Sequence, residues 1–184
     1  DLVNQLLDFR KTETKGFQMN FVDCDVAELL NVTYKRFKPL ANQRNLKLTI
    51  EMPEKLHASV DKEGLTKIIS NLLTNAIKYS ESYIRIRLDE EENRLRLVVA
   101  NDGPVIPLEM REKIFKPFVQ YKVGMVNAVS GTGIGLALAR SLAELHEGTL
   151  DMDDTTSENC FVLILPLQHA QTFAVKQENG PIAE

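Results

Sequence analysis

The chain has 184 residues and is 43% hydrophobic, which is enough for one domain with a proper core and short extensions. Its 22 basic and 26 acidic residues give a net charge of −4, which argues against a nucleic-acid partner, and no apolar run approaches the roughly 20 residues of a membrane span. The two cysteines and three histidines lack the spacing of a zinc site, so we expect Cys24 and Cys160 to be buried free thiols.

The chain opens with an amphipathic helical pattern over residues 1–13, which we expect to be the end of a longer helix that packs outside the core domain. Residues 17–25 alternate like a strand. A helix is predicted from Val26 to about Gln43, because Asp25 and Glu28 form a capping-box pattern. Its expected apolar face consists of Val26, Leu29, Leu30, Thr33, Phe37, Leu40 and Ala41.

Strands and helices continue to alternate after residue 45. The pattern predicts a strand over 46–52, a connector over 54–60 with a short extended piece at 58–60, and a helix capped by Asp61. A hairpin of strands 83–90 and 94–101 is expected next, then a turn after residue 101, a short helix over 108–115 and an irregular loop over 116–132. The last expected elements are a helix over 134–148 that stops at Gly148 as its C′ residue and a second hairpin up to about residue 167. This order predicts an α+β fold, a two-layer sandwich with a mixed, mainly antiparallel sheet of about five strands and three helices on one face.

Three polar residues stand in a line on the helix that follows Asp61. Asn71, Asn75 and Lys78 are four and three residues apart, so they share one face beside the apolar one. A solvent-facing flank is the ordinary interpretation, but asparagine is a poor helix former and two at this spacing need a reason. Amide oxygens suit Mg²⁺, and a lysine one turn further on suits a phosphate oxygen. The stripe therefore predicts a magnesium and phosphate site.

A second signal is "SGTGIGLALA", residues 130–139. Gly131, Gly133 and Gly135 lead directly into a predicted helix, where backbone N–H groups can approach an anion closely. The pattern is neither a P-loop, because GK[ST] is missing, nor a dinucleotide-binding fingerprint, because the spacing differs. A flexible turn before a helix is the simpler alternative, but the polar stripe favours a phosphate cradle.

These blocks together resemble the ATP-binding catalytic domain of sensor histidine kinases, within the Bergerat-fold ATPase group. In chain order, "NLLTNAIKYS" resembles the family's N box, "NDGPVIP" its first glycine box, "IFKPF" its F box and "GTGIGLALA" its second glycine box. The resemblance covers about residues 20–167, and four ordered blocks are far more specific than any single one. It implies a protein-histidine kinase that uses ATP and Mg²⁺.

The resemblance also implies roles for individual residues. Asn75 would be the main Mg²⁺ ligand, with Asn71 near the metal or the γ-phosphate and Lys78 on phosphate, so that Asn71 and Lys78 form the catalytic pair. Gly103 would lie at the adenine end, and residues 116–130 would form the ATP lid. The whole implied nucleotide site consists of Asn71, Asn75, Lys78, Tyr79, Asn101, Gly103, Ile106, Phe115, Phe118, Lys122, Gly131, Thr132, Gly133, Gly135 and Leu136. Phe115 and Phe118 would hinge the lid, in which Lys122 is a weaker candidate for a phosphate contact.

The resemblance sets expectations for the rest of the protein. Residues 1–16 would be the end of the second dimerization helix, 17–168 the ATP-binding domain, and 169–184 a linker that a receiver domain could follow, as in hybrid kinases. Because the chain begins with Asp and lacks the acceptor-histidine motif, we expect a cytoplasmic piece of a membrane-bound, homodimeric sensor. Its partners would be the histidine-bearing dimerization domain and a response-regulator receiver domain, with no nucleic acid and no membrane contact by this part.

Two positions depart from the family's first glycine box, and they leave alternatives open. Asn101 stands where the family usually has Asp, and Val105 stands where it usually has Gly. Both changes predict weaker or altered nucleotide binding, so a non-catalytic pseudokinase is one alternative. An ATPase of the gyrase, mismatch-repair or chaperone kind is another, but those relatives have a Glu at the position of Asn71, and an amide cannot act as that general base.

Overall fold

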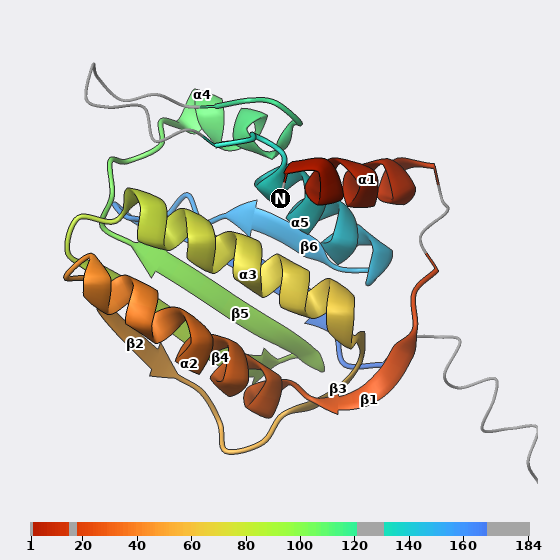
Figure 1. Ribbon diagram of the computed structural model, residues 1–184. Helices are drawn as coiled ribbons and strands as arrows, with labels where there is room; N and C mark the ends of the chain where they lie inside the picture. Colours follow the sequence, from red (N-terminus) through yellow and green to blue (C-terminus); the bar gives the residue numbers. More distant parts are fainter. Residues whose placement is uncertain (1, 15–17, 121–130, 169–184) are drawn as a thin grey trace, which may run out of the picture.

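The computed structural model describes residues 2–14, 18–120 and 131–168, and its central element is a twisted five-stranded sheet (Figure 1). The strands lie in the order β2 (Lys47–Glu51), β4 (Tyr83–Glu91), β5 (Arg94–Asn101), β7 (Asn159–Pro166) and β6 (Thr149–Met152). Strand β2 runs parallel to β4, and every other neighbouring pair is antiparallel. Among the described residues, no helix is long and apolar enough to cross a membrane.

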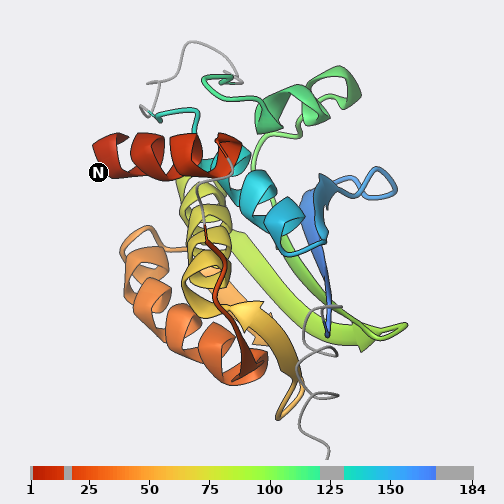
Figure 2. The same ribbon diagram turned by 90° about the vertical axis from the view of Figure 1, so that its right-hand side faces the viewer.

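Three helices cover one face of this sheet, as Figures 1 and 2 show: α2 (Val26–Gln43), α3 (Lys62–Tyr79) and α5 (Gly135–Leu145). The predicted two-layer α+β architecture is thus confirmed. The helix α1 (Leu2–Glu13) packs on the outer side of α5. A short helix α4 (Leu108–Arg111) and a 3₁₀ turn η1 (Lys113–Phe115) precede the segment that leads to α5.

A second, two-stranded sheet was not predicted. It pairs β1 (Phe21–Asp25) with β3 (His57–Asp61) in antiparallel register. The expected strand over 17–25 begins only at Phe21, and the short extended piece expected at 58–60 is part of β3. Local alternation does not reveal which distant segments pair, because the partner of β1 lies more than thirty residues away along the chain.

Alternating and helical apolar spacing accounts for the core. Ile84, Ile86 and Leu88 alternate along β4 and are all buried, which is the pattern of a sheet with one face packed on helices. Helix α3 contributes Leu65, Ile68, Ile69, Leu72 and Leu73, which are 0–1% exposed. The predicted N-caps are confirmed: Asp25 accepts hydrogen bonds from Ala27 N and Glu28 N, and Asp61 accepts one from Gly64 N.

The end of α5 differs from the prediction in one detail. Glu147, not Gly148, is the C′ residue in the left-handed region, with φ of 58°. Gly148 is the next residue, and its N–H bonds to the carbonyl of Ala143 while Glu147 N–H bonds to that of Glu144, which is a Schellman motif. Glycine is required at 148 for space, because a Cβ there would lie 2.2 Å from the carbonyl oxygen of Ile164 in β7.

Candidate functional site

The polar stripe of α3 lies at the edge of the core. Asn71, Asn75 and Lys78 are half-buried, whereas the intervening Leu72 and Ala76 are buried. The helix thus presents its apolar face to the sheet and its two amides and one ammonium along the border between core and solvent. A stripe in that place can hold a ligand without breaking the core.

The second glycine block lies directly against this stripe. A Cβ on Gly135 would be 2.9 Å from Oδ1 of Asn71, and a Cβ on Gly131 would be 2.6 Å from Nζ of Lys78. The backbone can approach these polar groups so closely only because it carries no side chains there. The fold therefore brings together the two sequence blocks, which are more than fifty residues apart, around the ends of Asn71 and Lys78.

The start of α5 has backbone donors to offer. The helix is capped by Ile134, whose side chain makes no capping hydrogen bond. Ile134 N itself donates to Oγ1 of Thr132 at 3.2 Å. The first N–H groups of α5 and the positive end of its dipole thus favour an anion at this helix end. They lie beside Lys78 and Asn71 through the glycine contacts described above, so positive charge and donors converge from two elements.

Phe118 and Gly133 form the near end of the predicted lid. Both have positive φ, 66° and 69°, and Phe118 N–H donates to the Gly133 carbonyl at 2.8 Å. A Cβ on Gly133 would lie 2.9 Å from the backbone of Phe118, so glycine is needed there for both conformation and space. Phe118 is 66% exposed. Lys122 lies outside the described residues.

Phe115, one of the two predicted hinge residues of the lid, is part of the core. It is 5% exposed, meets Phe161 edge to face with ring centroids 6.2 Å apart, and lies under the Arg140 guanidinium at 4.4 Å. Ile106 and Leu136 are partly buried and pack against the same core. These three predicted site residues thus belong to the core or pack against it.

The first glycine block forms the other end of the site. Asn101 is 2% exposed, and its Nδ2 has no hydrogen-bond partner. A Cβ on Gly103 would lie 2.2 Å from the carbonyl oxygen of Tyr79 and 2.9 Å from Asn101 Nδ2, so glycine lets the loop close onto the end of α3. Tyr79 is 46% exposed, and the Lys78 ammonium lies 4.8 Å from its ring centroid. A buried amide without a partner is rare in folded proteins and suggests that a ligand completes it.

Asp102 points away from Asn101, as the alternation of a strand predicts. Its carboxylate accepts hydrogen bonds from the backbone N–H groups of Glu81, Ser82 and Tyr83 at 3.0–3.1 Å, and so holds the turn between α3 and β4. Burial raises the pKa of Asp102, but these backbone hydrogen bonds outweigh burial and keep the pKa below its ordinary value of 3.8. Asp102 is therefore a structural carboxylate and not a substitute for an acid at position 101.

Val105, where the family usually has Gly, does not adopt a backbone conformation that requires glycine. Among the described residues its φ is not one of the positive values, and its side chain is 51% exposed. The left-handed conformation that a glycine would permit is not used at this position. The chain bends at Gly103 and Pro104 instead, and the expectation that Val105 weakens or alters nucleotide binding stays a prediction.

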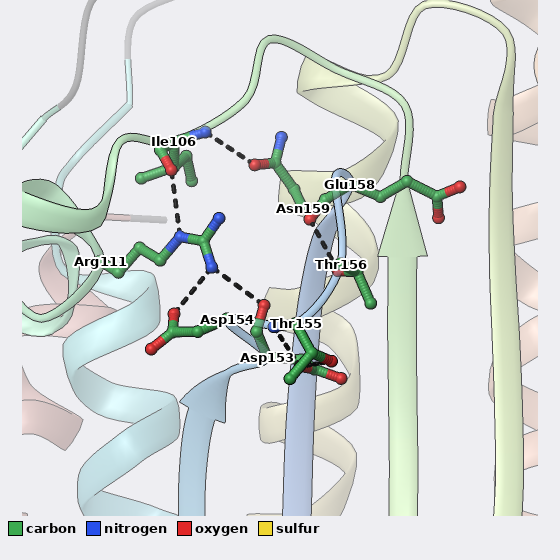
Figure 3. A network of polar contacts seen from close by, with 8 residues as sticks. All are labelled: Ile106, Arg111, Asp153, Asp154, Thr155, Thr156, Glu158 and Asn159. Carbon is green, nitrogen blue, oxygen red and sulfur yellow. Dashed lines mark hydrogen bonds and ion pairs between the residues drawn. The ribbon is translucent and has the colours of Figure 1, made fainter.

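Sequence reasoning missed two residues that hold the first glycine block in place, Asn159 and Arg111 (Figure 3). Asn159 is 3% exposed and bonds to Ile106 N, and Arg111 is 8% exposed and bonds to the Ile106 carbonyl. The available signal was an Asn at an inward position of a strand that is otherwise apolar. Alternation alone cannot say what such an amide contacts.

Helix α1 also reaches the site. Thr132 Oγ1 is 3.0 Å from Oε1 of Gln5, and Asp8 forms an ion pair with Lys67 of α3 at 2.9 Å. A groove of about 660 Å³ lies between α1 and α3 and is lined by Gln5, Asp8 and Asn71 among others. The N-terminal helix thus borders the polar stripe and the second glycine block together.

Comparison with known proteins identifies the family of this chain. Residues 60–169, more than half of the chain, match the histidine kinase-, DNA gyrase B- and HSP90-like ATPases. The chain belongs to this family. The ATPase domain of histidine kinases binds ATP, so this ATPase-family chain contains an ATP-binding domain.

Similar proteins narrow the assignment within the family. The sensor histidine kinase TmoS of Ectopseudomonas mendocina is 34% identical over 169 residues, which are 90% of this chain and 17% of TmoS. The catalytic domain of histidine kinase ThkA has a TM-score of 0.73 and 28% identity, over 82% of this chain and 97% of that domain. A structure of ThkA in complex with the response regulator TrrA, at 23% identity, has a TM-score of 0.71 over 90% and 48% of the two chains and shows the shared fold. The domain is thus of the histidine kinase catalytic type, and it spans less than a third of the first curated relatives' length.

Proposed function

We propose that this domain transfers the γ-phosphoryl group of ATP to a histidine on a dimerization domain of the same two-component sensor. The observation that carries the proposal is the meeting of the Asn71 and Lys78 ends with the second glycine block at Gly135 and Gly131. Phosphoryl transfer requires mainly positioning and neutralisation of charge, and these groups are suited to both.

The proposed roles follow from the chemistry of each group. Asn75 is the main Mg²⁺ ligand and Asn71 lies near the metal or the γ-phosphate, because neutral amide oxygens are suitable hard ligands. An ion held by these amides would neutralise negative charge on the phosphates. Lys78 and the N–H groups at the start of α5 bind phosphate oxygens. Residues 116–130 act as a lid hinged at Phe115 and Phe118, and Lys122 is a candidate phosphate contact within it.

Asn101 is proposed to recognise the adenine edge. An amide can accept a hydrogen bond from the adenine amino group and donate one to the adjacent ring nitrogen. Its unpartnered Nδ2 supports this role, and its neutrality predicts a weaker contact than that of a carboxylate. The sequence relatives are named as sensor histidine kinases, which favours an active kinase over a pseudokinase.

The remaining parts of the protein are assigned by proposal as well. Helix α1 is the end of the second dimerization helix, and its exposed Val3, Leu6 and Leu7 suit a place in a helical bundle of a homodimer. Residues 169–184 form a linker. The partner that receives the phosphoryl group from the histidine is a receiver domain, by analogy with the ThkA–TrrA complex. The chain is the cytoplasmic part of a membrane-bound sensor.

Two measurements test this function. Calorimetric titration of the chain with a non-hydrolysable ATP analogue should give binding that depends on Mg²⁺. The full-length protein, incubated with Mg·ATP, should form acid-labile phosphohistidine. Binding without phosphohistidine would support the pseudokinase, and steady ATP turnover by the chain alone would support an ATPase in which Asn71 is not a barrier to hydrolysis.

A further inference from the structure

The loop between β5 and α4, residues 102–107, is held by two buried side chains from different elements. Asn159 opens β7, and Arg111 ends α4. Figure 3 shows both side chains converging on Ile106, Asn159 at its backbone N–H and Arg111 at its carbonyl oxygen. This loop begins beside Asn101 at the base end of the proposed nucleotide site and ends at the helix that precedes the lid.

Asn159 uses its whole amide on this loop. Oδ1 accepts from Ile106 N at 2.9 Å, and Nδ2 donates to the carbonyl oxygens of Gly103 at 3.2 Å and Pro104 at 2.9 Å. One side chain thus binds three backbone groups of a segment that lacks regular secondary structure. Because buried backbone groups need partners, these bonds fix the path of the loop.

Arg111 holds the same loop from the other side. Its Nε donates to the Ile106 carbonyl at 3.1 Å, and its Nη1 donates to the Asp153 carbonyl at 3.0 Å and to Oδ1 of Asp154 at 2.7 Å. The two acceptors of Nη1 lie in the turn of the β6–β7 hairpin, which hydrogen bonds from Thr155 to the Asp153 carboxylate stabilise locally. The guanidinium therefore connects the loop to a turn with its own support.

Asn159 also stands next to the base end of the site. It is the direct cross-strand partner of Asn101, and both residues are 2–3% exposed. Asn101 Nδ2 would be 2.9 Å from a Cβ at Gly103, the residue whose carbonyl Asn159 binds. A shift of the loop would thus change the space in front of Asn101, while the phosphate end at Gly131 and Gly135 lies on another segment.

We infer that Asn159 and Arg111 are positioning residues for the purine base of the nucleotide: they fix the 102–107 loop so that Asn101 and Gly103 can receive it. The inference rests on the proposed function. It predicts that disturbing this network weakens binding of the base and leaves binding of the phosphates unchanged. If the two residues had a purely structural role, their substitution would lower stability and would change the affinities for base and phosphates equally or not at all.

The test compares two probes on the chain by calorimetry, ADP with Mg²⁺ and tripolyphosphate with Mg²⁺. Asn159→Asp keeps the acceptor for Ile106 N but loses both donors and places a charge beside two carbonyl oxygens. We expect ADP affinity to fall at least about tenfold at pH 8, as the loss of two hydrogen bonds implies, with tripolyphosphate affinity within about twofold. Relative to the unaltered chain at each pH, the loss should shrink as the pH falls, because a protonated carboxyl regains a donor. The matched control is Asn42→Asp, the same substitution at an exposed position of α2.

Arg111→Lys is the second variant, and it decides the matter if Asn159→Asp does not fold. A lysine cannot reach three separated acceptors, so ADP affinity should fall about threefold with tripolyphosphate unchanged. The control is Arg94→Lys, at an exposed position on β5. Equal affinities for ADP in variant and unaltered chain, or an equal loss for both probes, would overturn the inference alone. If the unaltered chain binds neither ADP nor tripolyphosphate, both the proposed function and the inference are overturned.

Discussion

Asn71, Asn75 and Lys78 show how a few polar residues can occupy a core helix without harming it. They are half-buried at the border of α3, where the apolar residues beside them already fill the core. The Asn71 amide oxygen lies against the glycine backbone at 135, where the helix border meets the second glycine block.

Replacing Asn75 by Ala should remove the Mg²⁺-dependent part of nucleotide binding. The amide oxygen is the proposed main metal ligand, and alanine is a better helix former, so the fold should be retained or slightly stabilised. Calorimetry with an ATP analogue should show the same weak affinity with and without Mg²⁺. Thr74→Ala, at the adjacent exposed position, should leave the magnesium effect intact. A full magnesium effect in the Asn75 variant would exclude this residue as the main ligand.

Elements in this domain are joined by single polar side chains at their ends. His146 caps α5, is completely buried, and contacts the carbonyl of Leu142 through Nδ1 at 2.7 Å. Its Nε2 accepts the N–H of Asp61 at 3.1 Å, at the junction of β3 and α3. A carbonyl can only accept, so Nδ1 carries the proton and the ring is neutral. One imidazole thus connects two helices that both carry site residues.

His146→Ala should lower the free energy of unfolding by about 2–4 kcal/mol, because it leaves a cavity and deprives the Asp61 N–H of its acceptor. Urea unfolding followed by circular dichroism measures the change. Glu144→Ala, at an exposed position on the same helix, should change stability by less than about 0.5 kcal/mol. A His146 variant as stable as this control would contradict the role assigned to the ring.

The turn between α3 and β4 depends on the ionised form of Asp102. Its pKa is lowered in the folded state, so its contribution to stability is present above the ordinary carboxyl pKa of 3.8 and is lost as the pH falls through the folded value. Asp102→Asn should therefore be less stable than the unaltered chain at neutral pH, and the difference should narrow below about pH 4. Urea unfolding at a series of pH values measures this difference. A difference that stays constant down to the acid limit would show that charge at Asp102 is not what holds the turn.

On the scale of the whole molecule, the proposed site is formed by three segments that meet only when the sheet and helices are assembled. The stripe comes from α3, the base end from the loop after β5, and the phosphate end from the approach to α5. The N-terminal helix α1 adds Gln5 and Asp8 at the same border. Binding of a nucleotide should therefore stabilise the fold as a unit.

At a concentration of Mg²⁺ and ATP analogue about one hundred times the dissociation constant, the domain should gain about 2.7 kcal/mol of stability. For a chain of this size that corresponds to a rise in melting temperature of about 5–10 °C. Differential scanning calorimetry measures the shift. Tripolyphosphate at the same multiple of its own dissociation constant should give a similar rise, because the gain depends on occupancy alone. A melting temperature that does not respond to saturating nucleotide would mean that the nucleotide does not bind selectively to the native fold.

The sequence by itself determined most of the helices and strands, and the proposed chemistry of the site rests on residue types and spacings that it displays. Apolar spacing and capping patterns predicted both ends of α2, the start of α3 and both hairpins, because burial of one face imposes periods that a sequence displays. It failed where the partner is distant: Leu40, expected on the apolar face of α2, is 48% exposed, and the pairing of β1 with β3 was not foreseen. Packing at a helix end and the choice of a strand partner depend on segments that local spacing does not contain.

Only the tertiary structure decided how the blocks fit together. It placed the glycines against Asn71, Lys78 and Tyr79, and it revealed that Asn159 and Arg111 hold the loop beside Asn101. Hydrogen bonds to backbone groups leave no residue-specific mark on the segment that is held, because every residue except proline offers the same N–H and C=O. The residues that bind a ligand can therefore be recognised by type and spacing, whereas those that hold the backbone in position become visible only once the chain is folded.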